Sequence, residues 1–147
     1  MTRLMQEKAE KLKADFDCQP CGKVHGIVLD RLTDTISEFS MPVSLRDCVI
    51  DIDKTCVVQG GVIAILADFA GVYLARLYSE SDAITPLVNL DEHYFRPVIL
   101  GKDEKIVARA FISEITDNRI HVKVLVENEK GDSKGQACLT FAKRFKN

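Results

Sequence analysis

Residues 59–76 combine residue types that could support chemistry at a carbonyl group. Gln59, Gly60 and Gly61 precede a long apolar run, so the glycines stand at the expected start of a helix. The free N–H groups at a helix N-terminus, together with the helix dipole, stabilise the negative charge that develops on a carbonyl oxygen under attack. Gly60 suits this place because no side chain blocks close approach. A glycine pair also permits a tight turn and close packing, and that alternative stays open.

Asp68 is the one charged residue of this run before Arg76. An ionised carboxylate inside an apolar helix costs free energy unless it is paired, hydrated in a cleft or used in a reaction. Burial would raise its pKa, and such a carboxylate can act as a general base or a nucleophile in hydrolysis. The alternative is a buried acid that is hydrogen-bonded to a neighbouring strand or subunit.

The spacing of these two features restricts how they can work together. Gly60 and Asp68 are eight residues apart in the sequence, which is about 12 Å along one helix at a rise of about 1.5 Å per residue. Groups so far apart cannot both touch one carbonyl carbon. If both serve one reaction, Asp68 must come from a second copy of the chain, and we therefore expect a homodimer or homotetramer.

The overall composition is typical of one folded, soluble domain covering residues 1–147. The chain is long enough for its own core, and its charged and hydrophobic fractions of 29% and 46% argue against disorder. A net charge of -2 gives no reason to expect a nucleic-acid partner. The polar N-terminus and an odd number of cysteines, five, favour a cytoplasmic protein with free thiols and no membrane partner.

Cys18 and Cys21 form a C-x-x-C pair, with His25 close behind. A zinc site would need a second pair, and a redox pair would be expected at a strand-to-helix turn. The other cysteines are scattered singly, at Cys48, Cys56 and Cys138. We therefore predict no metal site and no bound cofactor, and interpret the pair as structural or incidental.

The hydrophobic pattern along the chain predicts an α+β fold. Residues 1–17 are expected to form an amphipathic helix, residues 44–58 turns, and residues 59–78 a helix that is apolar on every face and therefore central. The apolar stripe of the first helix consists of Leu4, Met5, Ala9, Leu12 and Phe16. Strands are expected at 24–32, 35–43, 86–96, 104–115, 119–127 and 134–145. The last four read as an antiparallel meander over 86–145, so one sheet of five to six strands must curl round the central helix.

Several short motifs occur in a fixed order along this pattern. They are Asp53 with Cys56, Gln59-Gly60-Gly61, Leu66-Ala67-Asp68-Phe69-Ala70, Tyr94-Phe95-Arg96-Pro97 and the tail from Gly135 to Phe141. Together they resemble the hot-dog-fold acyl-CoA thioesterases of the phenylacetyl-CoA thioesterase type, from about Gly26 to Phe145. The family usually has asparagine at position 53, glycine at 56 and histidine at 59, where this chain has Asp53, Cys56 and Gln59.

The resemblance implies an acyl-CoA thioesterase whose active sites lie at a subunit junction and which takes a coenzyme A thioester as substrate. It implies that the Gly60 amide is the oxyanion donor and Asp68 the general base or nucleophile. Gln59 could donate from its side-chain amide in place of the family's imidazole.

Four further residues are predicted to bind substrate: Asp53, Gly61, Thr85 and Asn89. Asp53 precedes Gly60 by seven residues and could position water, although it could equally be an exposed loop acid. Thr85 and Asn89 flank a position where many relatives hold water with a polar residue, and which Leu87 occupies here.

Two other functions remain open at this point. The altered residues Asp53, Cys56 and Gln59 are reasons to consider a hot-dog protein that binds an acyl thioester or a fatty acyl chain without cleaving it. A dehydratase or hydratase of the same fold is disfavoured because no histidine stands at the opening of the central helix.

Overall fold

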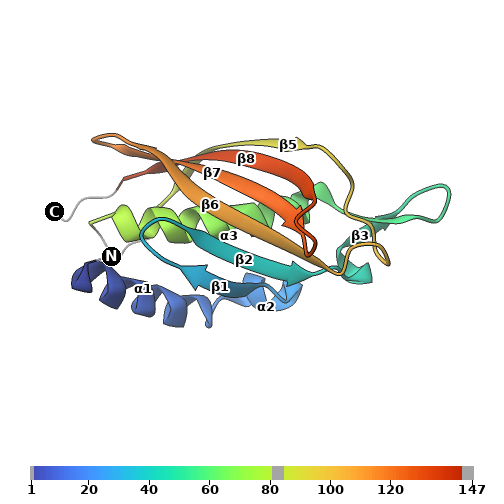
Figure 1. Ribbon diagram of the computed structural model, residues 1–147, viewed down its shortest axis with the longest axis horizontal. Helices are drawn as coiled ribbons and strands as arrows, with labels where there is room; N and C mark the ends of the chain where they lie inside the picture. The colour runs from blue at the N-terminus through green and yellow to red at the C-terminus, as the bar shows by residue number, and fades with distance from the viewer. Residues whose placement is uncertain (1, 81–84, 144–147) are drawn as a thin grey trace.

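The computed structural model describes residues 2–80 and 85–143. Its main feature is a six-stranded antiparallel sheet that curves round one long helix, α3 (Gly60–Tyr78), as Figure 1 shows. The strand order in the sheet is β1-β2-β6-β7-β8-β5. The strands are β1 (Val28–Leu32), β2 (Ser37–Pro42), β5 (Leu87–Tyr94), β6 (Lys105–Ile115), β7 (Arg119–Asn128) and β8 (Ser133–Ala142). The predicted α+β hot-dog architecture is therefore confirmed.

Helix α3 is the centre of the hydrophobic core. Leu66, Ala70 and Leu74 have no exposed surface, and each buried leucine contributes about 1.5–3 kcal/mol to folding. At Gly71 an added Cβ would lie 3.1 Å from a Leu139 methyl group, so glycine allows the helix to approach β8 closely. The helix is long and apolar enough to cross a membrane by length and composition alone, and its packing against the sheet accounts for that composition.

The sheet strands bury alternate side chains against α3, as the sequence pattern predicts. On β7 these are Ile120, Val122, Val124 and Val126, each at most 2% exposed. On β8 they are Ala137, Leu139 and Phe141. The opposite side chains of these strands lie on the outer face of the sheet.

The predicted four-stranded meander over 86–145 is wrong in its strand order. β5 pairs with β8 at the edge of the sheet, while β6 lies between β2 and β7. The segment after β5 makes no hairpin because it bonds elsewhere: Val58 N–H donates to Val98 C=O at 2.9 Å, and Leu100 N–H donates to Cys56 C=O at 3.0 Å. The end of the predicted meander, residues 144–145, lies outside the described residues.

The N-terminal region differs from the prediction in one strand and one side chain. The strand predicted at 24–32 begins only at Val28, because a second helix, α2 (Pro20–His25), starts at a proline and ends at Gly26 with φ +66°. Helix α1 (Arg3–Phe16) forms within the predicted range 1–17, of which Met1 lies outside the described residues. It buries Ala9, Leu12 and Phe16, whereas Leu4, at the start of the predicted apolar stripe, is 76% exposed.

Residues 44–58 contain short elements rather than turns alone. A 3-10 turn (Leu45–Asp47) leads into a hairpin of β3 (Cys48–Ile50) and β4 (Cys56–Val58). Strands of three residues carry too little alternation to be recognised in a sequence. The loop of this hairpin extends away from the body of the molecule, beyond the N-terminal end of α3 (Figure 1).

Candidate active site

The first turn of α3 presents two backbone N–H groups without a partner. Gln59 is the N-cap residue, with extended backbone at φ -65° and ψ 134°, and its side chain makes no capping hydrogen bond. Val62 N–H already donates to the Gln59 carbonyl at 3.0 Å. Within the described residues no hydrogen bond is donated by the N–H of Gly60 or Gly61. Two adjacent donors therefore face outward at the positive end of the helix dipole.

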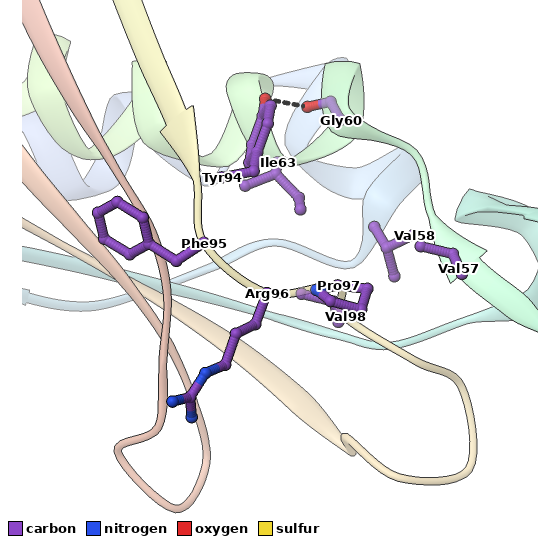
Figure 2. A pocket seen from close by; sticks show the side chains of 9 residues that line it. All are labelled: Val57, Val58, Gly60, Ile63, Tyr94, Phe95, Arg96, Pro97 and Val98. Carbon is purple, nitrogen blue, oxygen red and sulfur yellow. Dashed lines mark hydrogen bonds between the residues drawn. The ribbon is translucent and has the colours of Figure 1, made fainter.

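A pocket of about 330 Å³ opens beside this helix end (Figure 2). Val58 and Ile63 form its apolar side, Gly60 its helix end, and residues 94–98 its opposite wall. The Arg96 side chain is exposed and points away from the start of α3 (Figure 2). The pocket can therefore receive an apolar group whose polar end lies at the start of α3.

The outer wall of the pocket is held by hydrogen bonds from Lys134, a partly buried lysine. Lys134 Nζ donates to the Pro97 carbonyl at 3.2 Å and to the Asp103 carboxylate at 2.9 Å. Asn128 Nδ2 donates to the same carboxylate at 2.9 Å. These contacts fix the chain just after β5, so that the wall has a defined position relative to α3.

Tyr94 connects this wall to the helix. Its hydroxyl has one hydrogen, for which the Gly60 carbonyl, at 2.8 Å, and the Glu92 carboxylate are both acceptors. Burial, followed by the neighbouring Glu92 carboxylate, raises the pKa of Tyr94, so its hydroxyl stays protonated at neutral pH. Sequence reasoning treated Tyr94 only as the end of a strand. The period-two pattern that places Glu92 and Tyr94 on one face of β5 was the available signal.

Asp68 lies two turns further along α3 than Gly60. Its side chain is half-buried, and its Oδ1 atom is buried without a hydrogen-bond partner. Burial raises the pKa of this carboxyl above its ordinary value. Asp68 does not line the pocket at Gly60. Within one chain the structure therefore does not bring the two groups together, as the helix geometry requires.

One face of α3 remains partly uncovered by the sheet. It carries residues spaced three or four apart, which share one helix face. We call this face the open stripe, and it consists of Gly61, Ala64, Ile65, Asp68 and Val72. Gly61 is exposed and the other four are half-buried. The edge strand β5 lies beside α3 and pairs only with β8 among the described residues, so its other edge is unpaired.

Gln59 and Asp53 lie on the outside of this region. Gln59 is exposed and does not line the pocket. Asp53 is exposed in the loop between β3 and β4, where its Oδ1 accepts a hydrogen bond from Thr55 N–H at 2.9 Å. That backbone hydrogen bond lowers the pKa of Asp53. This geometry favours a turn-forming role for Asp53 over contact with a substrate at Gly60.

Thr85 and Asn89 do not approach Gly60 either. Thr85 precedes β5 at the end opposite Tyr94, and its hydroxyl is fully buried without a partner. Asn89 is paired with Thr140 and points to the outer face of the sheet, whereas Leu90 and Glu92 point to the α3 side. Of the predicted binding residues, the structure places only Gly61 next to Gly60.

The cysteine pair shows no special arrangement. Cys18 lies between α1 and α2, Cys21 lies in α2, and both are exposed and free. Across residues 2–80 and 85–143, no three His, Cys, Asp or Glu side chains are grouped as a metal ion would require.

Known structures share this fold. A thioesterase from Haemophilus influenzae is 22% identical with a TM-score of 0.77, covering 91% of this chain and 88% of that one. The PaaI protein from the phenylacetic acid degradation operon of E. coli is 16% identical with a TM-score of 0.80, covering 95% and 96%. A protein related to the thioesterase superfamily from Shewanella oneidensis is 14% identical with a TM-score of 0.81, covering 98% and 100%.

Sequence comparison adds the family. A search of curated proteins finds no match. Residues 57–134, however, match the sequence model of the thioesterase superfamily. The matched stretch exceeds half of the chain and runs from β4 through α3 to the start of β8, so it contains both the free helix N-terminus and Asp68. The chain therefore belongs to the thioesterase superfamily.

Proposed function

We propose that this protein is a homo-oligomeric thioesterase that hydrolyses acyl-CoA. The observation that carries the proposal is Asp68, a half-buried carboxylate in an apolar helix with one buried oxygen that has no hydrogen-bond partner. A group of this kind costs stability, and perturbed carboxylates are concentrated at functional sites. Family membership supplies the reaction class for which such a base is used.

In the proposed reaction, the thioester carbonyl lies at the N-terminus of α3. Its oxygen accepts a hydrogen bond from the Gly60 amide, which stabilises the negative charge of the tetrahedral intermediate. The Asp68 carboxylate takes a proton from a water molecule as the water oxygen bonds to the carbonyl carbon. When the intermediate collapses, the carbon–sulfur bond breaks and the departing thiolate recovers the proton from Asp68. The products are a carboxylic acid and free coenzyme A.

A second copy must supply Asp68 to the site, and the open stripe offers a way to do so. The midpoint between Gly60 and Asp68 is Ala64, which lies on that stripe. A twofold axis passing near Ala64 would place two α3 helices side by side and antiparallel, at the 8–10 Å typical of packed helices. Gly60 of each copy would then lie opposite Asp68 of the other.

The edge of the sheet supports the same mode of association. β5 has an unpaired edge next to α3, and its Val88 side chain is 51% exposed. Unpaired edges with apolar side chains are prone to pair with another chain. A second copy that covers both the open stripe and β5 would bury Asp68 further.

The pocket fits part of an acyl-CoA molecule. Its apolar walls suit the acyl chain or the pantetheine arm, and Gly60 provides the polar contact. We place the phosphates of coenzyme A beside Arg96, which makes no ion pair within the described residues and whose exposed side chain points away from α3 (Figure 2). A guanidinium is well suited to bind phosphate.

A second candidate function is acyl-CoA binding without hydrolysis. The observation in its favour is that Gln59 is exposed and does not line the pocket. Its side-chain amide therefore does not assist the Gly60 amide as a second donor.

A thiol-release assay distinguishes the two functions. Aromatic, short-chain and long-chain acyl-CoAs are tested with the unaltered protein, with Asp68→Asn and with Asp53→Asn as a matched control for the same chemical change. Hydrolysis by the unaltered protein that falls about 10²-fold in Asp68→Asn and persists in Asp53→Asn supports the proposal. Stabilisation by acyl-CoA without thiol release by any sample supports the binding function instead.

A further inference from the structure

The contact between Tyr94 and the first turn of α3 involves a peptide group of the site itself. Tyr94 donates its hydroxyl hydrogen to the carbonyl of Gly60 at 2.8 Å (Figure 2). That carbonyl belongs to the same peptide unit as the N–H of Gly61, and the two point in opposite directions along the helix. The Gly61 N–H is one of the two unpaired donors at the helix end.

A hydrogen bond to the carbonyl of a peptide unit polarises the whole unit. The Gly60 carbonyl is at the start of the helix, where it also accepts the N–H of the residue four positions later. A second donor withdraws more electron density from the amide, so its N–H becomes a stronger hydrogen-bond donor. Tyr94 therefore acts on the Gly61 amide without touching it.

The surroundings of the two glycines differ in a way that fits this role. A Cβ on Gly60 would lie 3.3 Å from the Tyr94 ring, so glycine lets the ring pack against the helix end. At Gly61, in contrast, an added Cβ would meet no atom within 4 Å apart from its chain neighbours and the backbone of its own helix. The side of the helix that carries Gly61 is therefore open.

Glu92 shares the tyrosine hydrogen with Gly60. It lies two residues earlier on the same face of β5, and its carboxylate accepts a hydrogen bond from the Tyr94 hydroxyl. Because the hydroxyl has one hydrogen, Glu92 holds the hydroxyl beside α3 but also reduces the share that the Gly60 carbonyl receives.

We propose that Tyr94, oriented by Glu92, is a positioning residue that fixes and polarises the Gly60–Gly61 peptide so that Gly61 N–H is a second oxyanion donor beside Gly60 N–H. This inference rests on the proposed thioesterase reaction. Two donors converging on one oxygen stabilise the tetrahedral intermediate more than one.

Tyr94→Phe tests the proposal because it keeps the ring and removes only the hydroxyl. Loss of a whole oxyanion donor costs about 10²–10³ in kcat, so loss of its polarisation is expected to lower kcat roughly tenfold with KM nearly unchanged. Glu92→Gln replaces a charged acceptor by a neutral one and leaves more of the hydrogen to the Gly60 carbonyl, so kcat is expected not to fall. Tyr78→Phe is the matched control, since Tyr78 also donates to a backbone carbonyl, that of Asp34, at the other end of α3. Its kcat is expected to stay unchanged.

An NMR measurement reads the polarisation without any activity. In protein labelled with 15N-glycine, which has only eight glycine signals, the Gly61 amide proton is identified by its loss in Gly61→Ala. It is expected to move upfield in Tyr94→Phe and to stay in place in Tyr78→Phe. If the unaltered protein cleaves no thioester, the proposed function fails, while this shift still tests the effect of Tyr94. An active Tyr94→Phe enzyme with unchanged kcat, or an unmoved Gly61 signal, would overturn the inference.

Discussion

Replacement of Asp68 by asparagine is expected to change stability and activity in opposite directions. The pKa of Asp68 is raised by burial, so the folded state holds this proton more tightly than the unfolded chain does. The favourable contribution of the protonated form is fully present below the ordinary pKa, and it is lost as pH rises through the raised pKa. Asparagine has nearly the same shape and cannot ionise, so the variant escapes this loss.

The expected size of the gain follows from the charge on the carboxylate. Leaving a buried polar atom unsatisfied costs about 1–3 kcal/mol, and more for a charged group. Asparagine keeps an oxygen at this place but not the charge, so only the additional cost of the charge is recovered, and we take about 1 kcal/mol because Asp68 is only half-buried. A gain of about 1 kcal/mol raises the Tm of a chain of this size by about 2–4 °C. The difference from the unaltered protein is expected at pH 7 and should disappear below the ordinary aspartate pKa, at about pH 3, where the aspartate is protonated in both states.

Thermal unfolding from about pH 3 to 8, alongside thiol release, measures both effects. Asp15→Asn is a control that is expected to change stability in the opposite direction. Asp15 lies in α1 and is hydrogen-bonded to α3. Arg76 donates to its carboxylate at 2.7 Å and Tyr73 at 2.8 Å. Although burial alone would raise the pKa of Asp15, these hydrogen bonds lower it, so its stabilisation is present at neutral pH and lost on acidification. Asp15→Asn should therefore lower Tm at pH 7 and leave kcat unchanged.

Two results would refute this reasoning about Asp68. An Asp68→Asn protein that is less stable than the unaltered protein at pH 7 would mean that the carboxylate is paired and structural. A variant of equal hydrolytic activity would mean that Asp68 is not the base. The acid limb of the activity profile gives a further check, since it should begin at a higher pH than an ordinary aspartate would produce.

Three other substitutions test separate parts of the site. Gly60→Pro removes the proposed donor at a first-turn position that accepts proline after the extended Gln59, so kcat should fall about 10²-fold, and Tm should also fall because its ring presses on Tyr94, whereas Gly61→Ala keeps both N–H groups and should stay active. Arg96→Ala should raise KM for acyl-CoA roughly two- to fivefold but leave KM unchanged for a thioester without phosphates. If the variant and the unaltered protein have the same KM for acyl-CoA, Arg96 has no role in phosphate binding. Ala64→Cys should form a disulfide-linked dimer under mild oxidation, unlike Glu10→Cys on the outer face of α1, and a failure to cross-link would place the twofold axis elsewhere.

The fold followed from the sequence wherever the hydrophobic period was long. The strand from Arg119 to Asn128 carries enough repeats to fix its type and the face it buries, and α3 is apolar over enough turns to fix its type and its central place. The place of β5 in the sheet could not be predicted, because strand order depends on where residues 95–104 find hydrogen-bond partners. Local patterns contain no information about such partners.

The site followed from the sequence only in its helical part. The helix start and Asp68 were recognisable because an acid and two glycines stand out in an apolar run. Tyr94 was missed because it comes from another strand and meets Gly60 only through the fold. Asp53 was expected near the site from its distance along the sequence, but it lies in a hairpin loop. Thr85 and Asn89 were expected there because they flank a position that is polar in many relatives, but one lies at the far end of β5 and the other on its outer face.

Mixing two inactive variants tests directly whether one active site combines Gly60 of one copy with Asp68 of the other. Gly60→Pro and Asp68→Asn are purified separately, unfolded together in equal amounts, refolded and assayed for thiol release. In a mixed dimer, one site has both defects and the other has neither. Half of the dimers are mixed and each of these has one intact site, so recovery of about one quarter of the activity of the unaltered protein is expected. If mixed dimers form and activity stays at the level of the separate variants, each site is built within one chain, and a site shared between two copies is excluded.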